Sequence, residues 1–535
     1  MRYLLLAFAV LLATPAAVTP AFGQDANTNR IIDQGTNHSQ VMTTAQHLTD
    51  VIGPRLPNSP QMRAAEAWTE GKFREWGLTN VHREGFPFGR GWSIDRSSVR
   101  MTAPRPVQLT AIPIAWTPPT RVTAPVIVAP MRRERDFAKW RGQLRGKVVM
   151  VTRPTDLRDP TDPVVQRLSG EEIAKLDKFE QPRFDPTALP RNLRRADFPE
   201  KLDAFLKAEG AVAYATMSRL DGKLVHGEGW AFETNRSAAI PGVEIAAEDY
   251  RRLARLAKVG PAPTLEIESA VRFHNDDTQA YNILADIPGT DAKAGYVMAG
   301  AHLDSWVAGD GAADNAAGSA VVMEAARILR ASGVRPKRAI RFALWNAEEE
   351  GLLGSIAYIR RHLATRGSPG DPQLNGDNLY YSFADQWPIT PLPGHRDLAA
   401  YFNIDNGSGK IRGLYAERNP AVVSTLQGWL APFASMGASS VVVSPTTGTD
   451  HVFMQSVGIP GFQFIQDPLD YDSRVHHTSV DTFDHLKADD LRQASIVLAS
   501  VLLSAANADR PLPRPPLPTR PAPTDPLAYP QDEDE

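Results

Sequence analysis

The sequence predicts an α/β fold, in which a mixed, mostly parallel central sheet is flanked by helices and a smaller β-rich domain is inserted. Residues 296–300 are an apolar run typical of a buried strand, 315–329 have the spacing of an amphipathic helix, and apolar residues alternate over 340–344. A strand, a crossover helix and another strand form a parallel pair. The same alternation continues to about 506, whereas 112–275 contains short strands separated by loops.

Composition limits the class of protein. A chain of 535 residues is too long for one compact core, so we expect two domains. A hydrophobic share of 42% and a net charge of −3 are ordinary for a globular protein and favour neither nucleic acid nor an anionic membrane surface as partner. Because the chain has no cysteine, His, Asp and Glu would have to hold any metal.

The two ends of the chain have their own composition. Residues 1–23 are predicted to be a signal peptide, with Arg2, an apolar core over 4–12 and small residues at Ala21 and Gly23. The apolar run is too short to span a bilayer, so we expect export to the periplasm or the extracellular space without stable membrane insertion. Residues 509–535, rich in proline and acidic at the end, are predicted to be a disordered tail.

Three regions lie between these ends. Residues 24–111 are predicted to form the N-terminal part of the main domain, with helices over 41–52 and 62–76 and a strand over 81–88. The inserted domain, 112–275, is predicted to have strands and helices at 126–128, 147–151, 201–209, 210–215, 240–245 and 247–256. The main domain resumes over 276–508, with strands at 296–300, 340–344, 398–404 and 461–465 and a closing helix at 491–503.

Acidic or imidazole side chains follow three of the predicted strands. His302, Glu348 and Asp405 come just after 296–300, 340–344 and 398–404. Ligands of open α/β sheets bind at the carboxyl ends of the strands, so these side chains are expected to lie together. Imidazole and carboxylate are ligands for zinc, and cobalt or manganese would also suit them.

These motifs resemble a known family. His302, Asp314, the pair Glu348-Glu349, Asp405 and His477 occur in the order and context of the co-catalytic di-zinc aminopeptidases, which include bacterial leucyl aminopeptidases and glutamate carboxypeptidases. The block 112–275 resembles the protease-associated domain of many members. The run His302-Leu303-Asp304-Ser305-Trp306, the run Arg335-Pro336-Lys337-Arg338 and the pair His476-His477 look most similar to the carboxypeptidase Q-like bacterial members.

The resemblance implies a role for each residue. Asp314 would bridge two zinc ions, His302 and Asp405 would complete one site, and Glu349 and His477 would complete the other. Glu348 would be the general base.

Further residues around this set have weaker signals. By resemblance, Asp304 would orient His302. His476 stands where many members have a tyrosine that helps hold the oxyanion, and it is a candidate for that role. Asp310 is an alternative ligand, and Glu350 is expected to be exposed. Expectations for three other positions are a pocket wall for Asp450, a helix cap for Asp481 and a surface or structural role for His226.

The function expected from the resemblance is that of an exported zinc exopeptidase. It would act as an aminopeptidase on short peptides, through a water activated by the metals. A homodimer is a candidate oligomeric state. A carboxypeptidase Q-like metallodipeptidase is the alternative. A further alternative is a non-catalytic, receptor-like binding protein of the same fold.

Overall fold

The computed structural model describes residues 26–157, 161–179, 185, 187–367 and 378–517. The predicted signal peptide lies outside these ranges, as does most of the predicted tail. Among the described residues, no helix combines the length and the hydropathy that a bilayer span requires.

The central sheet has eight strands within the described residues, in the order β1-β10-β12-β11-β15-β18-β16-β17. Their bounds are β1 Thr79–Pro87, β10 Gln279–Ile287, β11 Tyr296–His302, β12 Ala339–Trp345, β15 Leu398–Asn403, β16 Ile411–Tyr415, β17 Ser440–Val442 and β18 Gly461–Gln466. The four strands β12, β11, β15 and β18 at its centre run parallel, and antiparallel neighbours flank them on both sides. The predicted mixed, mostly parallel sheet is confirmed.

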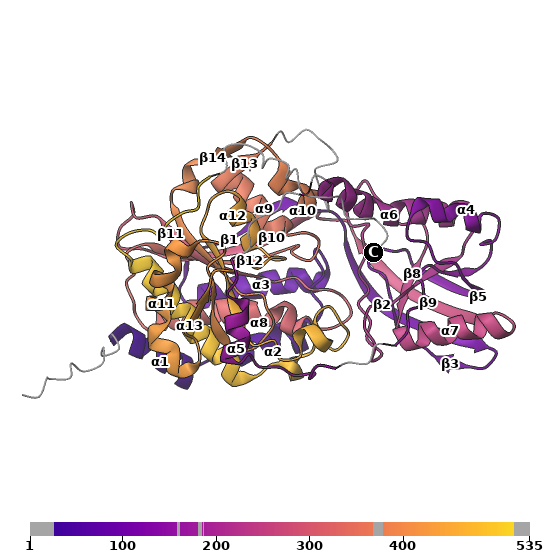
Figure 1. Ribbon diagram of the computed structural model, residues 1–535, viewed down its shortest axis with the longest axis horizontal. Coiled ribbons are helices and arrows are strands. Elements are labelled where there is room, and N and C mark those ends of the chain that lie inside the picture. Colours follow the sequence, from indigo (N-terminus) through magenta and orange to yellow (C-terminus); the bar gives the residue numbers. More distant parts are fainter. Residues whose placement is uncertain (1–25, 158–160, 180–184, 186, 368–377, 518–535) are drawn as a thin grey trace, which may run out of the picture.

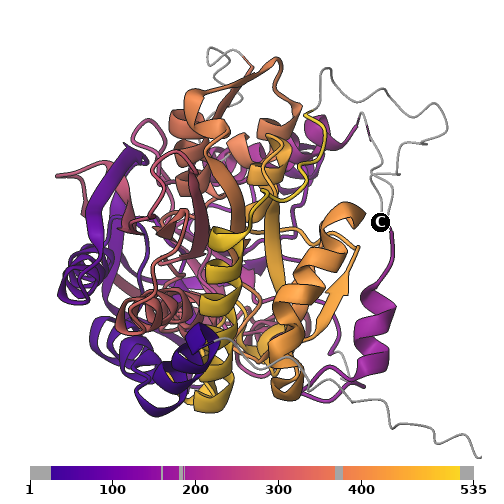
Figure 2. The same cartoon turned by 90° about the vertical axis from the view of Figure 1, so that its left-hand side faces the viewer.

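Helices cover both faces of this sheet (Figure 1). One core contains apolar side chains of α1 (Ala26–Asn37), α2 (Val41–Gln46), α8 (Ala317–Ala331) and α13 (Ala488–Asn507). The opposite core contains those of α9 (Leu353–Tyr358), α10 (Leu379–Ser382) and α12 (His451–Ser456). Figure 2 shows α13, in yellow, alongside the strands. Since both faces of the central strands are buried, their sequences are nearly continuous apolar runs.

A second sheet forms the other domain, to the right in Figure 1. Its order is β3-β2-β9-β5-β6-β7-β8-β4. The strands are β2 Gly91–Ala103, β3 Val107–Gln108, β4 Ala111–Pro113, β5 Thr120–Val128, β6 Val148–Met150, β7 Ala213–Met217, β8 Gly242–Ile245 and β9 Thr264–His274. Helix α6 (Ala188–Ala208) packs on one face and α7 (Ala247–Val259) on the other.

The second sheet starts earlier in the chain than residue 112. Strand β2 pairs with β9 along almost its whole length, from the pair Gly91–His274 to the pair Ala103–Thr264. Its partner strand is far away in sequence, so local patterning could not assign β2 to this sheet. Helix α6 begins at Ala188, well before the predicted helix at 201–209, and it continues through Pro199.

Candidate metal centre

The proposed ligands all lie at the carboxyl edge of the central sheet. His302 is the last residue of β11, Glu348 and Glu349 lie in the turn after β12, and Asp405 follows β15. Asp314 lies in the kinked segment Ala312–Ala316, just before α8, where its own backbone is not helical, and it comes to the same edge. This convergence follows from the parallel order of the strands, because their carboxyl ends meet at one edge.

Asp314 lies between the two proposed imidazole ligands. Its Oδ1 is 3.2 Å from His302 Nε2, and its Oδ2 is 3.1 Å from His477 Nε2. His302 Nε2 is also 3.3 Å from Asp405 Oδ1, and His477 Nε2 is 2.9 Å from Glu349 Oε2. The structure therefore brings all five side chains together, with one carboxylate facing both imidazoles.

The charges of this cluster fit a divalent cation. Glu349 Oε1 is buried and accepts no hydrogen bond from the described residues, which is costly for a carboxylate oxygen. Burial lowers the pKa of His302 and His477, but the surrounding carboxylates outweigh it and raise both pKa values well above the ordinary one. The cluster thus attracts positive charge, and a metal ion would compete with protons for the same nitrogen and oxygen atoms.

His302 is held in an orientation that suits a ligand. Its Nδ1 donates a hydrogen bond to the backbone carbonyl oxygen of Asp304 over 3.1 Å, which leaves Nε2 facing the cluster. The Asp304 carboxylate is 3.7 Å from the same nitrogen, and its Oδ2 accepts a hydrogen bond from the Glu349 backbone N–H. Asp304 therefore contacts both His302 and the segment that carries Glu349.

Glu348 lies beside this cluster. Its Oε2 is 4.0 Å from His302 Nε2, and the residue lines the cavity described below. Burial raises the pKa of Glu348 well above its ordinary value, the carboxylates of Asp405 and Asp450 add to this rise, and His302 opposes it. A carboxylate with a raised pKa binds a proton more readily near neutral pH, which suits a group that accepts and then returns one.

Glu350 is buried, with 7% of its surface exposed, so the prediction that it is exposed was wrong. The turn after β12 closes through hydrogen bonds from the Gly351 and Leu352 N–H groups to the Glu348 carbonyl oxygen. This turn folds all three glutamates into the cavity wall, whereas the sequence pattern shows only an acidic run.

The Asp481 carboxylate binds the backbone at Asp314. Its carboxylate accepts hydrogen bonds from the backbone N–H groups of Ala313, over 2.7 Å, and Asp314, over 3.0 Å. The sequence pattern predicts a helix cap at Asp481 and does not reveal this contact. The only local signal is its closeness in sequence to His477.

Arg55 is fully buried and binds the loop between β11 and α8. Its guanidinium donates hydrogen bonds to the carbonyl oxygens of Leu303, Asp310 and Gly311, over 2.7 to 2.8 Å. It also donates to the carbonyl oxygens of Leu48 and Gly53. Burial lowers the pKa of Arg55 to about 10, with nearby carboxylates opposing this, so the side chain is cationic at neutral pH.

We expect Arg55→Lys to lower the free energy of unfolding by about 3 kcal/mol or more, because three ammonium donors cannot serve five buried carbonyl oxygens. Urea unfolding followed by circular dichroism measures this change. Arg74→Ala is the control, because the Arg74 side chain is 56% exposed and its ion pair with Glu70 should contribute about 1 kcal/mol or less. Equal losses in the two variants would contradict the role given to Arg55.

A cavity of about 670 Å³ opens over the cluster and is lined by both domains. The main domain contributes Glu348, His477 and Tyr380, and the second domain contributes Glu228 and Trp230. A cavity of this volume is in the range of small-ligand sites and suits a short peptide.

His476 lies at the edge of the cluster. Its Nε2 is 3.7 Å from Asp314 Oδ2, its ring is 3.9 Å from that of His477, and it lines the cavity. The backbone carbonyl oxygen of His476 accepts a hydrogen bond from Arg219 of the second domain over 2.6 Å.

His226 is a second-domain residue whose contact the sequence did not reveal. The side chain is buried, and its ring stacks on that of His477 at 4.8 Å with an interplanar angle of 23°. Its ring also meets Trp306 edge-on at 4.9 Å. A lone histidine in a loop carries no signal of such packing, because its partners lie elsewhere in the chain.

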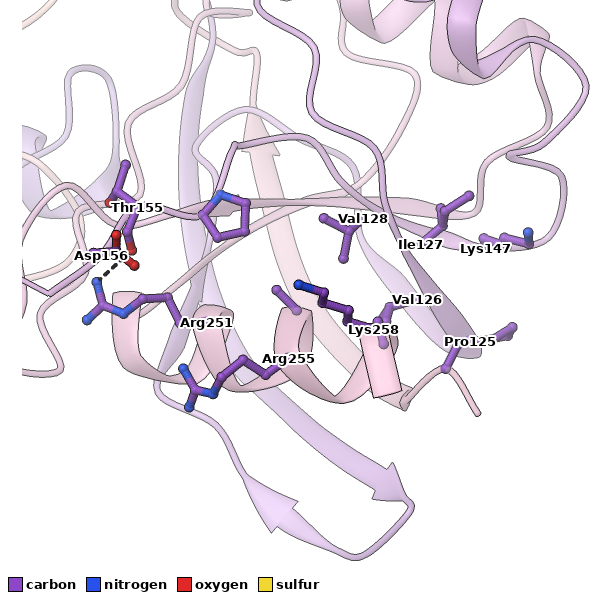
Figure 3. Close-up of a pocket in the computed structure, with 14 residues that line it drawn as sticks. Pro125, Val126, Ile127, Val128, Lys147, Thr155, Asp156, Arg251, Arg255 and Lys258 are labelled. Atoms are coloured by element: carbon purple, nitrogen blue, oxygen red, sulfur yellow. Dashed lines mark hydrogen bonds between the residues drawn. The ribbon is translucent and has the colours of Figure 1, made fainter. Parts of the chain in front are cut away.

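Another cavity, of about 700 Å³, lies between α7 and strand β5 of the second sheet (Figure 3). Its lining includes Lys147, Arg251, Arg255 and Lys258, with Asp156 as the acidic member. Without imidazoles among its lining residues, this cavity is no candidate for the hydrolytic site.

Known proteins are similar to this chain in sequence. Residues 282–502 match the family model described as Peptidase family M28. Carboxypeptidase Q of Bos taurus is 27% identical over 473 residues, which cover 87% of this chain and 85% of that protein. The corresponding Homo sapiens protein is 26% identical over 471 residues, again covering 87% and 85%.

Solved structures share the fold. A Peptidase M28 precursor from Shewanella amazonensis has a TM-score of 0.65 at 22% identity and covers 92% of this chain and 100% of its own. A zinc aminopeptidase from Bacillus subtilis has a TM-score of 0.56 at 19% identity and covers 88% and 95%. Such low identities establish the α/β fold alone. The family match over residues 282–502, together with the converging ligand set, shows that the chain is a metallo-exopeptidase with a segment similar to Peptidase family M28.

Proposed function

We propose that this chain is a zinc-dependent exopeptidase that holds two zinc ions and removes a terminal residue from short peptides. Asp314 would bridge the ions, with His302 and Asp405 on one and Glu349 and His477 on the other. The observation that carries this assignment is the position of Asp314, whose two carboxylate oxygens face different imidazoles at 3.2 and 3.1 Å.

Bound zinc would polarise the scissile carbonyl group and lower the pKa of water. The chain's own groups would supply the rest of the reaction. Glu348 would take a proton from the attacking water and pass it to the leaving amine. Asp304 would keep His302 and Glu349 in place, and the imidazole of His476 would donate a hydrogen bond to the developing oxyanion.

Two substrate preferences remain candidates within this function. An aminopeptidase would require a free amino terminus. A dipeptidase similar to carboxypeptidase Q is the second candidate, and the carboxypeptidase Q relatives support it because they align over 87% of this chain. The predicted signal peptide, residues 1–23, makes export to the periplasm or the extracellular space part of the proposal.

Metal analysis together with a panel of dipeptides tests the proposal. The purified protein should contain two zinc ions per chain and hydrolyse dipeptides whose termini are both free. An aminopeptidase would lose activity on amino-acetylated dipeptides and keep it on carboxy-amidated ones, whereas a dipeptidase would lose it on both. Binding of peptides without hydrolysis, in a protein that purifies without stoichiometric zinc, would support the receptor-like alternative.

A further inference from the structure

A third cavity, of about 390 Å³, lies in the second domain. It is directly beside the cavity of about 670 Å³ over the proposed metal ligands, which is called the catalytic cavity below. The third cavity lies on the α6 side of the second sheet. Its apolar lining residues come from α6, from β7 and from the segments beside them: Ile114, Phe198, Leu202, Leu206, Tyr214 and Met217. The volume lies in the range of small-ligand sites, and the lining is largely apolar, as in such sites.

This cavity and the catalytic cavity share a wall. Pro199 of α6 and the three residues of the segment 228–230 line both of them. Within that segment, a Cβ on Gly229 would lie 2.1 Å from the Ala115 carbonyl oxygen, so only glycine lets the backbone approach so closely. The backbone of this segment therefore packs directly against the backbone of Ala115. The two cavities meet at the side chains of Glu228 and Trp230.

Two carboxylates that line the cavity already accept hydrogen bonds from the backbone. Asp203 accepts hydrogen bonds from the backbone N–H groups of Ala239 and Ile240, and Glu244 accepts them from those of His226 and Gly227. Carboxylates with these partners do not demand a polar ligand. The remaining lining is mainly aliphatic and aromatic, so burial of an apolar group is the interaction that the cavity favours.

The second domain also contacts the loop that carries the proposed ligand His477. His226 stacks on His477, and Arg219, which lines this cavity, donates to the His476 carbonyl oxygen. The cavity thus lies next to the proposed reacting centre and is aligned with it by direct contacts between the domains.

We propose that the 390 Å³ cavity is a substrate subsite that takes a bulky apolar side chain, of the leucine or phenylalanine kind, from the peptide being hydrolysed. The second domain would then select substrates as well as cover the site. This inference rests on the proposed exopeptidase function and adds a side-chain preference to it.

Substitutions that fill the cavity test the subsite. Thr216, a half-buried residue of β7, lines the cavity, and tryptophan there would occupy part of its volume. The readout is kcat/KM for Ala-Ala, Phe-Ala and Ala-Phe. For one of the phenylalanine dipeptides, Thr216→Trp should lower the ratio of its kcat/KM to that of Ala-Ala by about 10- to 100-fold, the range seen for apolar pockets that change in size.

Val128→Trp is the matched control. Val128 is a half-buried strand residue of the same sheet, and it lines the separate cavity on the α7 side (Figure 3). Its ratios should equal those of wild type. Phe198→Ala, which enlarges the proposed subsite, should shift the preference from phenylalanine towards tryptophan side chains. If Thr216→Trp does not fold, this second variant tests the subsite.

The outcomes separate the two proposals. A folded Thr216→Trp with wild-type ratios, the same fall in Val128→Trp, or a Phe198→Ala with unchanged preference would overturn the subsite while leaving the exopeptidase function intact. A zinc-loaded wild-type enzyme that hydrolyses none of the three dipeptides would instead remove the proposed function.

Discussion

Glu348→Gln is expected to lower kcat by about 10²- to 10⁴-fold while zinc content stays near that of wild type. Glutamine has almost the same shape but cannot accept the proton of the attacking water. Glu348 is not one of the proposed ligands, and it lies 4.0 Å from His302 Nε2 at the cavity wall. Steady-state kinetics on a free dipeptide, paired with elemental analysis of the same preparation, measures both quantities.

Glu350→Gln is a matched control for this variant. Glu350 is buried in the same turn and carries the same side chain, but it has no proposed part in proton transfer. Its loss of kcat should be far smaller. If Glu348→Gln kept near-normal turnover with a full complement of zinc, Glu348 would not be the general base.

Asp314→Ala is expected to remove at least one zinc ion per chain and to reduce hydrolysis to background. Asp314 is the carboxylate that faces both imidazoles, so its loss removes a ligand from both proposed sites at once. It would also leave two divalent cations without the negative charge that offsets their mutual repulsion. Zinc stoichiometry measured after extensive dialysis shows the change directly.

Asp310→Ala controls for the general loss of a carboxylate near the site. Asp310 lies shortly before Asp314 in the sequence and was predicted as the alternative ligand. It belongs to none of the clusters of possible metal ligands among the described residues. This variant should keep its zinc. Two zinc ions retained by Asp314→Ala, or a zinc loss confined to Asp310→Ala, would contradict the bridging assignment.

The local sequence pattern was enough to predict the parallel strands at the centre of the sheet and the edge of the sheet at which the site lies. The apolar run before His302, the alternation before Glu348 and the run before Asp405 each mark a strand whose end can be read from the sequence alone. The order of strand, helix and strand then places these ends on one side. Resemblance to a family added the role expected of each residue.

Contacts between distant segments were beyond the reach of the same reasoning. The guanidinium of Arg55 holds the loop before Asp314, the Asp481 carboxylate binds the Asp314 backbone, and His226 packs on His477. Each contact joins residues far apart in the chain. The sequence positions of hydrogen-bond donors and aromatic rings follow no periodic pattern from which their partners could be predicted. Only the folded chain identifies these partners.

By itself, then, the sequence determined the class of fold, the edge that bears the chemistry and the types of side chain available there. Periodicity and residue chemistry are local properties and can be read along the chain. The tertiary structure alone decided that Glu350 is buried, that β2 belongs to the second sheet and that a second-domain cavity adjoins the cavity over the proposed metal ligands. These features depend on which surfaces meet when distant segments pack, and that is a property of the whole fold.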